Sequence, residues 1–314
     1  MNITICCPGQ SPEPWVSALL QALPQATVKA WVEGDPPADY AVVWAPPPVF
    51  LHSQTRLKAL LAMGAGIDKL LQLPLPAGVP VIRLQDAGMA QQMVTYVCQG
   101  VLRHVRSFDV YAQQQRQGIW RALPVGEGDD TPVRVGVLGL GALGAPVAQA
   151  LRTLGFEVHG WRRSAPAAST SDSLAGITQH MGSAGLSTCL QHSQVLVNML
   201  PLTPQTQDLL NRTTLMHLPR GAYLINVARG AHVVDDDLLD LINQGHLSGA
   251  LLDVFRTEPL PPQHPFWSHP RITVTPHISA RTWVGPSVQQ MVHNIVAIEN
   301  GHTAVGSVDA ARGY

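Results

Sequence analysis

The sequence predicts an α/β protein built from doubly wound parallel sheets in two domains. Short apolar runs alternate with helical patterns along nearly the whole chain, which is typical of strand–helix–strand units with right-handed crossovers. The length of 314 residues suggests about two domains, each large enough to bury a core. Because 46% of the residues are hydrophobic and only 13% are charged, the composition is that of a globular chain and excludes a disordered one.

The first hundred residues predict a small parallel α/β unit. Helical spacing of apolar residues between Trp15 and Leu23 predicts a helix. A further apolar run leads into Met63-Gly64-Ala65-Gly66-Ile67-Asp68. Strands are expected at 2–7, 26–32, 40–44 and 79–84. After this unit, one long helix is expected over 91–117, long enough to cross between domains or to form a subunit contact.

The stretch on which the rest of the chain depends is 134–144, a short apolar strand that runs into G-x-G-x-x-G and then into a helical pattern. Gly139 permits a tight turn off the strand. Gly141 lets a pyrophosphate approach the backbone, and Gly144 lets the helix pack close to the strand. The amino end of that helix offers free N–H groups and the positive end of a dipole to phosphates. With strand and helix in this order, the motif predicts a dinucleotide site.

The strand expected at 156–161 indicates which dinucleotide binds. An NAD site usually carries an acidic residue roughly 20 positions after the first glycine, where it holds the ribose 2′-OH. This chain has Trp161-Arg162-Arg163-Ser164 at that place. Two guanidiniums and a hydroxyl suit a 2′-phosphate, so NADP(H) is predicted, with NAD(H) as the weaker alternative. The competing interpretation of Arg162 and Arg163 is a solvated basic loop.

The remaining elements continue the same alternation. Leu238, Leu239 and Ile242 predict a helix, and apolar spacing predicts a last helix over 285–300. The segment 125–132 is rich in glycine and aspartate and predicts a surface loop. The segment 164–185 is rich in alanine, serine and glycine, is poorly periodic and shows no pattern that indicates chemistry. Four more strands are expected at 195–199, 222–227, 249–254 and 272–275.

Three of these strands are followed by ionisable residues, namely Arg229, Glu258 and His277. Since ligands of parallel sheets bind beyond the carboxyl ends of the strands, the three side chains are expected to line one cleft beside a nicotinamide. An arginine can hold a carboxylate and polarise a ketone, and a histidine can protonate the oxygen as hydride reaches carbon. A glutamate can fix the histidine tautomer and stabilise its protonated form. The alternatives are a phosphate or carbonyl clamp for Arg229, a turn cap for Glu258 and a core position for His277.

Charge and composition exclude several other classes. The net charge is −1 with no long charged run, so neither nucleic acid nor an anionic membrane surface is expected as a partner. No apolar stretch reaches the length of a membrane span, and the amino terminus has no signal-peptide pattern. The four cysteines, Cys6, Cys7, Cys98 and Cys189, predict reduced and mostly buried thiols in a cytoplasmic protein. No Cys/His spacing suggests a metal.

The motifs together resemble the D-isomer-specific 2-hydroxyacid dehydrogenase family over nearly the whole chain. Within it, the chain is similar to the bacterial branch that reduces glyoxylate and hydroxypyruvate, through 40–44, the Trp161 turn and the ending 309–314. The motifs that carry the family resemblance are 64–68, 139–144, 198–206, 226–230, 253–255 with 258–259, and 275–277. The resemblance implies two Rossmann-like domains, with the dinucleotide-binding domain (99–280) inserted in a discontinuous substrate domain (1–98 and 281–314).

The resemblance also implies roles for individual residues. Arg229 would bind substrate, His277 would be the general acid/base and Glu258 its partner, while Asp253 would bind the nicotinamide carboxamide. The family's usual acidic residue after the second Rossmann strand is missing, which agrees with the arginine argument for NADP(H). The residues expected to contact the cofactor are Gly139, Gly141, Ala142, Leu143, Gly144, Trp161, Arg162, Arg163, Ser164, Leu200, Pro201, Thr206, Val227, Ala228, Arg229, Asp253 and His277. Those expected around the substrate are Trp44, Met63, Gly64, Ala65, Gly66, Arg229, His277 and Trp283, with the two tryptophans as pocket walls or core residues.

The sequence thus predicts an NADPH-dependent reductase of small 2-keto acids, glyoxylate and hydroxypyruvate first, that forms a homodimer through the long helix and its neighbours. Two alternatives remain open at this stage. One is another dehydrogenase of the family, such as a D-lactate type. The other is a nucleotide-sensing binding protein of the same fold.

Overall fold

The computed structural model describes residues 1–124, 131–164 and 174–309, arranged in two compact units. The terminal unit comprises Met1–Met89 and Arg281–Tyr314, and the central unit comprises Ala90–Ala280. The second boundary coincides with the expected one, whereas the first lies after Met89 and not after residue 98. Most of the loop expected at 125–132, part of the segment 164–185 and nearly all of the ending 309–314 lie outside the described residues.

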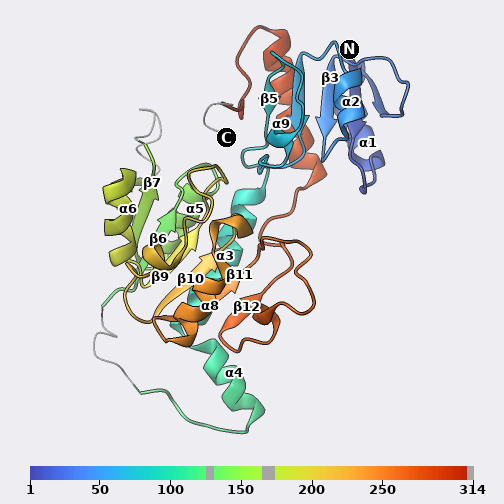
Figure 1. The fold of residues 1–314 in the computed structure, drawn as a ribbon. Coiled ribbons are helices and arrows are strands. Elements are labelled where there is room, and N and C mark those ends of the chain that lie inside the picture. Colours follow the sequence, from blue (N-terminus) through green and yellow to red (C-terminus); the bar gives the residue numbers. More distant parts are fainter. Residues whose placement is uncertain (125–130, 165–173, 310–314) are drawn as a thin grey trace. The chain divides into compact units, whose positions relative to one another are not determined.

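The terminal unit is built on a sheet of five parallel strands in the order β2-β1-β3-β4-β5. The strands are β1 (Asn2–Cys6), β2 (Thr27–Ala30), β3 (Tyr40–Val43), β4 (Ala59–Ala62) and β5 (Val81–Ile82). Its helices are α1 (Glu13–Ala22), α2 (Pro48–Ser53), the single turn η1 (Leu70–Gln72) and α9 (Val284–Glu299). Figure 1 labels β3 and β5 of this sheet and the helices α1, α2 and α9. Glu299 joins α9 to the sheet by accepting hydrogen bonds from the Tyr40 hydroxyl and the Lys58 ammonium, both at 2.7 Å.

The expected strands of this unit are present but shorter than predicted, and α2 was not expected. The three prolines at 46–48 were interpreted as the end of a strand. They also begin a helix, because a proline is favoured at the first helical position, where its missing N–H would have no intrahelical partner.

The central unit carries a sheet of seven parallel strands in the order β12-β11-β10-β9-β6-β7-β8, which confirms the predicted doubly wound fold. The strands are β6 (Arg134–Leu138), β7 (Glu157–Arg162), β8 (Thr178–Met181), β9 (Val195–Asn198), β10 (Ala222–Asn226), β11 (Leu247–Leu252) and β12 (Ile272–Val274). The helices are α3 (Met89–Val105), α4 (Phe108–Arg116), α5 (Gly144–Thr153), α6 (Gly182–Gln191), α7 (Arg212–Leu215) and α8 (Asp235–Asn243), with single turns η4 (Gly230–His232) and η5 (Pro265–Trp267).

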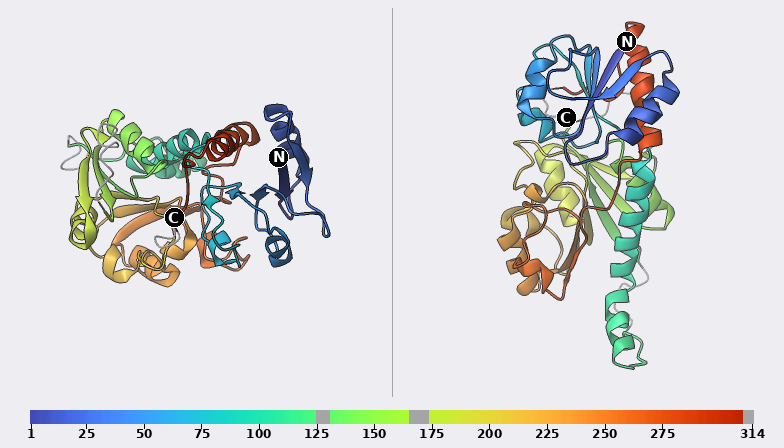
Figure 2. Two further views of the ribbon diagram at one scale, coloured as in Figure 1. Left: turned by 90° about the horizontal axis from the view of Figure 1, so that it is seen from above. Right: turned by 90° about the vertical axis from the view of Figure 1, so that its right-hand side faces the viewer.

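Helices cover both faces of this sheet, as Figure 2 shows from two directions. Alternate strand residues point to opposite faces. On one face, Val135 and Val137 of β6 pack with residues of α3 and α5, while Leu138 belongs to the other face with residues of α6, α7 and α8. A central strand buried on both faces needs apolar residues at every position, which explains the continuous apolar runs of β6, β9 and β10.

The single helix expected over 91–117 is wrong, because the chain forms two helices with a break at residues 106 and 107. Ser107 has a φ of 54°, in the left-handed region, so the helix cannot continue through it. The apolar spacing continues across the break, and periodicity alone does not detect one residue of reversed φ.

The segment 164–185 is poorly periodic in sequence, and no strand was predicted in it, but it contains β8 and the start of α6. β8 lies at the edge of the sheet, and its residues are exposed or half-buried. An edge strand of this kind shows no apolar pattern, which is why the sequence did not reveal it.

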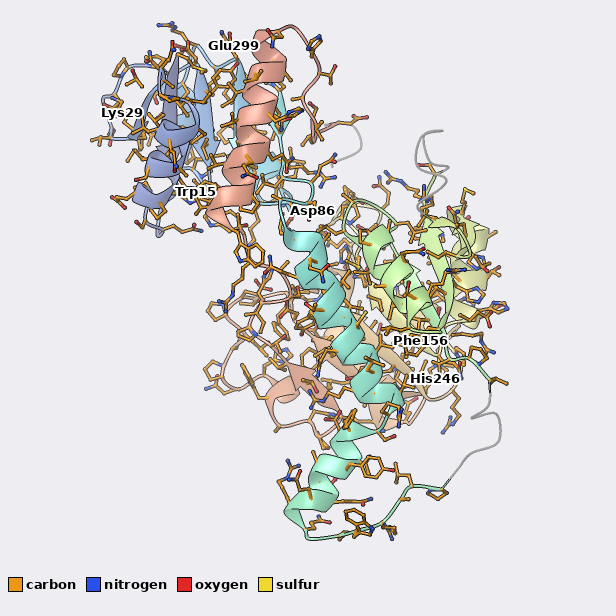
Figure 3. All side chains as sticks on the ribbon, turned by 180° about the vertical axis from the view of Figure 1, so that it is seen from behind. Trp15, Lys29, Asp86, Phe156, His246 and Glu299 are labelled. Atoms are coloured by element: carbon orange, nitrogen blue, oxygen red, sulfur yellow. The ribbon has the colours of Figure 1, made fainter. Side chains whose placement is uncertain are left out.

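Because all strands of this sheet are parallel, they begin on one side of the unit and end on the other. Figure 3 labels Phe156 and His246, which directly precede β7 and β11, on the side where the strands begin. Arg229, Glu258 and His277 follow β10, β11 and β12 and belong to the side where the strands end. Among the described residues no helix is both long and apolar enough to cross a membrane.

Candidate active site

The glycine-rich turn between β6 and α5 shows a different constraint at each glycine. Gly139 has a φ of 98°, and a Cβ there would lie 2.8 Å from the carbonyl oxygen of Met199. A Cβ on Gly144 would lie 1.8 Å from the carbonyl oxygen of Gly139, so helix and strand approach as closely as backbone allows. Gly141 is exposed, and a Cβ there would meet nothing within 4 Å. Among the described residues no side chain caps the amino end of α5, and the Ala145 N–H donates to the Gly141 carbonyl oxygen at 3.0 Å. The positive end of the helix dipole, beside the open backbone of Gly141, is the feature that favours phosphates here.

Arg162 ends β7 next to this turn and donates from Nη2 to the carbonyl oxygen of Leu140 at 3.4 Å. Its buried Nε has no hydrogen-bond partner among the described residues. Burial lowers the pKa of the Arg162 guanidinium below its usual value, because desolvation disfavours the cation. An anionic ligand would accept a hydrogen bond from Nε and would stabilise the desolvated cation. Arg163 is exposed and donates to Oε1 of Gln205 at 3.4 Å.

Trp161 and Ser164 differ in exposure, although both were predicted as cofactor contacts. The Trp161 side chain is buried and donates from Nε1 to the carbonyl oxygen of Gly182 at 2.8 Å, which ties β7 to the first residue of α6. Ser164 is exposed beyond the strand. The structure therefore gives Trp161 a packing role at the edge of this region. These residues, with the turn and helix end, form a cradle that fits a dinucleotide carrying a 2′-phosphate.

Two buried asparagines end neighbouring strands and hold the loops that follow. Asn198 ends β9, and its Oδ1 accepts from the Leu200 N–H at 3.3 Å. Asn226 ends β10, accepts from the Ala228 N–H at 3.2 Å and donates to the Arg229 carbonyl at 3.0 Å. Asn198 also donates from Nδ2 to Asn226 Oδ1 at 3.0 Å, so the two loops are fixed relative to each other.

His232 is fully buried and completes this network. Its Nδ1 lies 3.0 Å from Asn198 Nδ2 and its Nε2 lies 3.3 Å from the Pro201 carbonyl oxygen. Since an amide nitrogen only donates, Nδ1 accepts and Nε2 donates, which fixes the tautomer. The Thr206 hydroxyl, predicted as a cofactor contact, donates to the same carbonyl oxygen at 2.7 Å and closes the loop. The asparagine pair and His232 were not predicted as site residues, although an asparagine at the end of each of two apolar strands is a usable signal.

The loop after β10 carries Arg229 against the loop after β11. Arg229 donates from Nη1 to the Ala228 carbonyl oxygen at 2.7 Å and is half-buried. A Cβ on Gly230 would lie 1.9 Å from the backbone carbon of Phe255, so only glycine allows the two loops to touch here. The glycine that follows Arg229 therefore sets how close the arginine lies to the loop of Glu258.

Glu258 and His277 are joined by a hydrogen bond between the carboxylate and the imidazole. The Oε2 of Glu258 lies 2.9 Å from His277 Nδ1, and its Oε1 accepts the Phe255 N–H at 2.9 Å. The carboxylate is thus oriented by the backbone and orients the imidazole in turn, leaving Nε2 as the nitrogen for proton exchange. The His277 side chain is 45% exposed, which a group that meets a substrate requires and a core histidine does not.

Asp253, predicted to bind a nicotinamide carboxamide, is fully buried. Its carboxylate accepts from the Thr275 hydroxyl at 2.6 Å and from the N–H groups of Ile278 and Ser279, each at 2.8 Å. A carboxylate offers about four acceptor positions, so at most one is left for a ligand. The three bonds hold the turn that carries His277.

The other predicted substrate residues belong to the terminal unit and are described within it. The Met63 N–H donates to the Val43 carbonyl oxygen at 3.0 Å, and a Cβ on Gly64 would lie 3.0 Å from the ring of Trp44. A Cβ on Gly88 would likewise lie 3.1 Å from the ring of Trp283. Both tryptophans are about half-exposed, so neither is a core residue. In the described part of the chain, no group of three or more His, Cys, Asp or Glu residues is arranged to hold a metal ion.

Comparison with known proteins gives a consistent set of relatives. The family model of the D-isomer specific 2-hydroxyacid dehydrogenase, NAD binding domain, matches residues 98–279. The chain is 48% identical to a glyoxylate/hydroxypyruvate reductase A of Serratia proteamaculans over the full length of both proteins.

Two solved structures are similar over the whole chain. One is a D-isomer specific 2-hydroxyacid dehydrogenase of Xanthobacter autotrophicus in complex with NADPH and MES, with 39% identity and a TM-score of 0.92 over 100% of this chain and 99% of that one. The other is an NADPH-dependent glyoxylate/hydroxypyruvate reductase of Sinorhizobium meliloti in complex with NADP and sulfate, with 33% identity and a TM-score of 0.90 over the same shares.

We predict that the same substitution has different effects at two glycines of the turn. Gly144→Ala should lower the free energy of unfolding by about 1–3 kcal/mol, because the clash of the new methyl group with the Gly139 carbonyl oxygen outweighs the helix propensity that alanine adds. Gly141→Ala should change it by less than about 0.5 kcal/mol, since the space is open, but should weaken NADPH binding. Urea unfolding and a fluorescence titration with NADPH measure the two effects. Equal destabilisation by both variants would contradict the packing described for Gly144.

Proposed function

Because the chain belongs to the D-isomer specific 2-hydroxyacid dehydrogenase family, we propose that it is an NADPH-dependent reductase of small 2-keto acids, foremost glyoxylate and hydroxypyruvate. The observation that carries the proposal is that Glu258 and His277 pair beyond the carboxyl ends of the strands, the same side of the sheet as the glycine-rich turn. The name of the Serratia relative and the NADP-bound Sinorhizobium structure support the substrate and cofactor classes.

The chemistry follows from the arrangement of the three side chains. The hydride that reaches the keto carbon of the substrate would come from bound NADPH. Arg229 binds the substrate carboxylate and polarises the ketone, because its guanidinium offers a planar fork of donors. His277 donates the proton from Nε2 to the keto oxygen, which becomes the hydroxyl of glycolate or D-glycerate. Glu258 stabilises the protonated imidazole before the transfer and keeps its Nδ1 oriented afterwards.

We predict that His277→Ala lowers kcat by roughly 10²–10⁴-fold while NADPH still binds, because the variant loses its proton donor. The measurement is the loss of NADPH absorbance with glyoxylate, hydroxypyruvate, pyruvate and 2-ketobutyrate, repeated with NADH. His293→Ala, on α9 of the terminal unit, is the matched control and should keep wild-type turnover.

Largely intact turnover in His277→Ala would show that the acid/base assignment is wrong. Saturable NADPH binding by the wild-type protein without turnover of any 2-keto acid would instead favour a nucleotide-sensing role of the same fold.

The preference for NADPH rests on Arg162 and Arg163 in this proposal. The buried guanidinium nitrogen of Arg162 and the exposed cation of Arg163 suit the charge and the oxygens of a 2′-phosphate. We predict that Arg162→Ala with Arg163→Ala raises the KM for NADPH by about tenfold or more, since a charge-assisted hydrogen bond contributes roughly 1.5–3 kcal/mol. The KM for NADH should change much less. An equal rise for both cofactors, measured by steady-state kinetics, would refute the role of the arginines.

A homodimer is the second part of the proposal. Large apolar side chains are exposed along the end of α3, on α4 and in the residues that follow, namely Leu102, Phe108, Val110, Tyr111, Ile119 and Trp120. Trp120 is fully exposed, and a groove of about 610 Å³ lies between α3 and α4. A two-fold symmetric dimer buries the same surface of both subunits, so that surface must be complementary to itself, and one that has both a projecting side chain and a groove meets this condition. Exposed apolar patches of this kind mark protein interfaces.

We predict that Phe108→Ser with Trp120→Ser converts a dimer into a monomer, because it removes the apolar anchors of this surface. Size-exclusion chromatography with light scattering gives the mass. Val32→Ser, which replaces an exposed apolar residue of the terminal unit, should leave the dimer intact. A monomeric wild-type protein, or a double variant that remains dimeric, would exclude this interface.

A further inference from the structure

The turn that carries His277 has an unusual backbone for a residue of its size. His277 has a φ of 53°, in the left-handed region that a side chain with a Cβ rarely adopts. Its N–H donates to the Asp253 carbonyl oxygen at 2.9 Å, while the Asp253 carboxylate binds the next two N–H groups, those of Ile278 and Ser279. Asp253 therefore holds the turn from both its backbone and its side chain. The direction of the His277 imidazole therefore depends on these hydrogen bonds to Asp253.

A second residue fixes the orientation of that carboxylate. The Thr275 hydroxyl, two residues before His277, donates to Oδ1 of Asp253 at 2.6 Å. A threonine hydroxyl has one proton, and a carboxylate only accepts, so this proton is committed to Asp253. The Thr275 oxygen remains an acceptor.

Tyr96 supplies the donor for that oxygen. Its hydroxyl lies 2.5 Å from Thr275 Oγ1, and because the threonine proton is committed to Asp253, the tyrosine donates. Burial raises the pKa of the Tyr96 hydroxyl to about 12, so the tyrosine keeps its proton throughout the working pH range. The result is one directed chain of hydrogen bonds from Tyr96 through Thr275 to Asp253.

The chain starts from a rigid element. Tyr96 lies on α3, and its neighbours Val97 and Val101 are fully buried against the sheet of the central unit. A side chain on a packed helix is placed more exactly than one on a loop, and a misplacement of about 1 Å of a reacting group costs on the order of a hundredfold in rate. The turn of His277 is a loop and depends on such an anchor.

We propose that Tyr96 and Thr275 are positioning residues for His277, which set the aim of the imidazole through the carboxylate of Asp253. The inference rests on the proposed function, in which His277 is the proton donor. Neither hydroxyl contacts the histidine directly; both act through the turn.

The test uses substitutions that remove a hydroxyl and keep the shape of the side chain. Thr275→Val should lower kcat by about ten- to a hundredfold with little change in NADPH affinity, and Thr275→Ser should restore it. Tyr96→Phe should lower kcat less, and the double variant Tyr96→Phe, Thr275→Val should be no slower than Thr275→Val alone, because both break one chain. Tyr40→Phe removes a buried tyrosine's hydrogen bond to Glu299 in the terminal unit and is the matched control, with unchanged kcat.

A second readout does not depend on turnover. The ¹⁵N resonances of the His277 imidazole, followed through a pH titration, should shift in Thr275→Val and return to the wild-type values in Thr275→Ser. Thermal unfolding of each variant shows whether it is folded.

The proposal is overturned if Thr275→Val and Tyr96→Phe lower the melting temperature but leave both kcat and the His277 resonances unchanged, or if Thr275→Ser does not restore them. A wild-type protein without turnover of any 2-keto acid would refute the proposed function alone. The imidazole resonances would then still decide whether Tyr96 and Thr275 position His277.

Discussion

A buried polar side chain at the end of each of three neighbouring strands is the constraint on which the site depends. Asn198 closes β9, Asn226 closes β10 and Asp253 follows β11, and all three are fully buried. A buried amide or carboxylate must find hydrogen-bond partners, and those available beyond a strand end are the N–H groups and carbonyl oxygens of the adjoining loops. Satisfying these groups therefore fixes the loops that carry the chemistry.

This arrangement places adaptable loops on a rigid support. The apolar packing of the sheet fixes where each strand ends, and the hydrogen bonds of the buried polar group fix the following loop relative to that strand end. Arg229 is set by the bonds of Asn226 and by the contact of Gly230 with the Phe255 backbone, while the turn of His277 is set by Asp253. Groups held in this way need little reorganisation when a substrate binds, which is the condition for effective electrostatic and proton-transfer catalysis.

Sequence patterns predicted the features that depend on local chemistry. The roles of Gly139 and Gly144 follow from backbone sterics, and the apolar strands follow from their burial on both faces. Patterns failed where tertiary context decides. The one long helix is two, because Ser107 adopts a left-handed conformation, and the edge strand β8 carries no apolar signal because it faces solvent.

By itself, the sequence determined the doubly wound α/β fold, the dinucleotide turn and the three ionisable residues after successive strands, because strand pattern and motif spacing are local. Only the tertiary structure decided which hydrogen bonds hold the loops that carry these residues. The sequence led us to expect the pairing of Glu258 with His277, which the structure contains, but not the occupied carboxylate of Asp253 or its link through Thr275 to Tyr96, which is distant in the chain. Hydrogen bonds of this range depend on how helix and sheet pack, and no spacing within one segment encodes them.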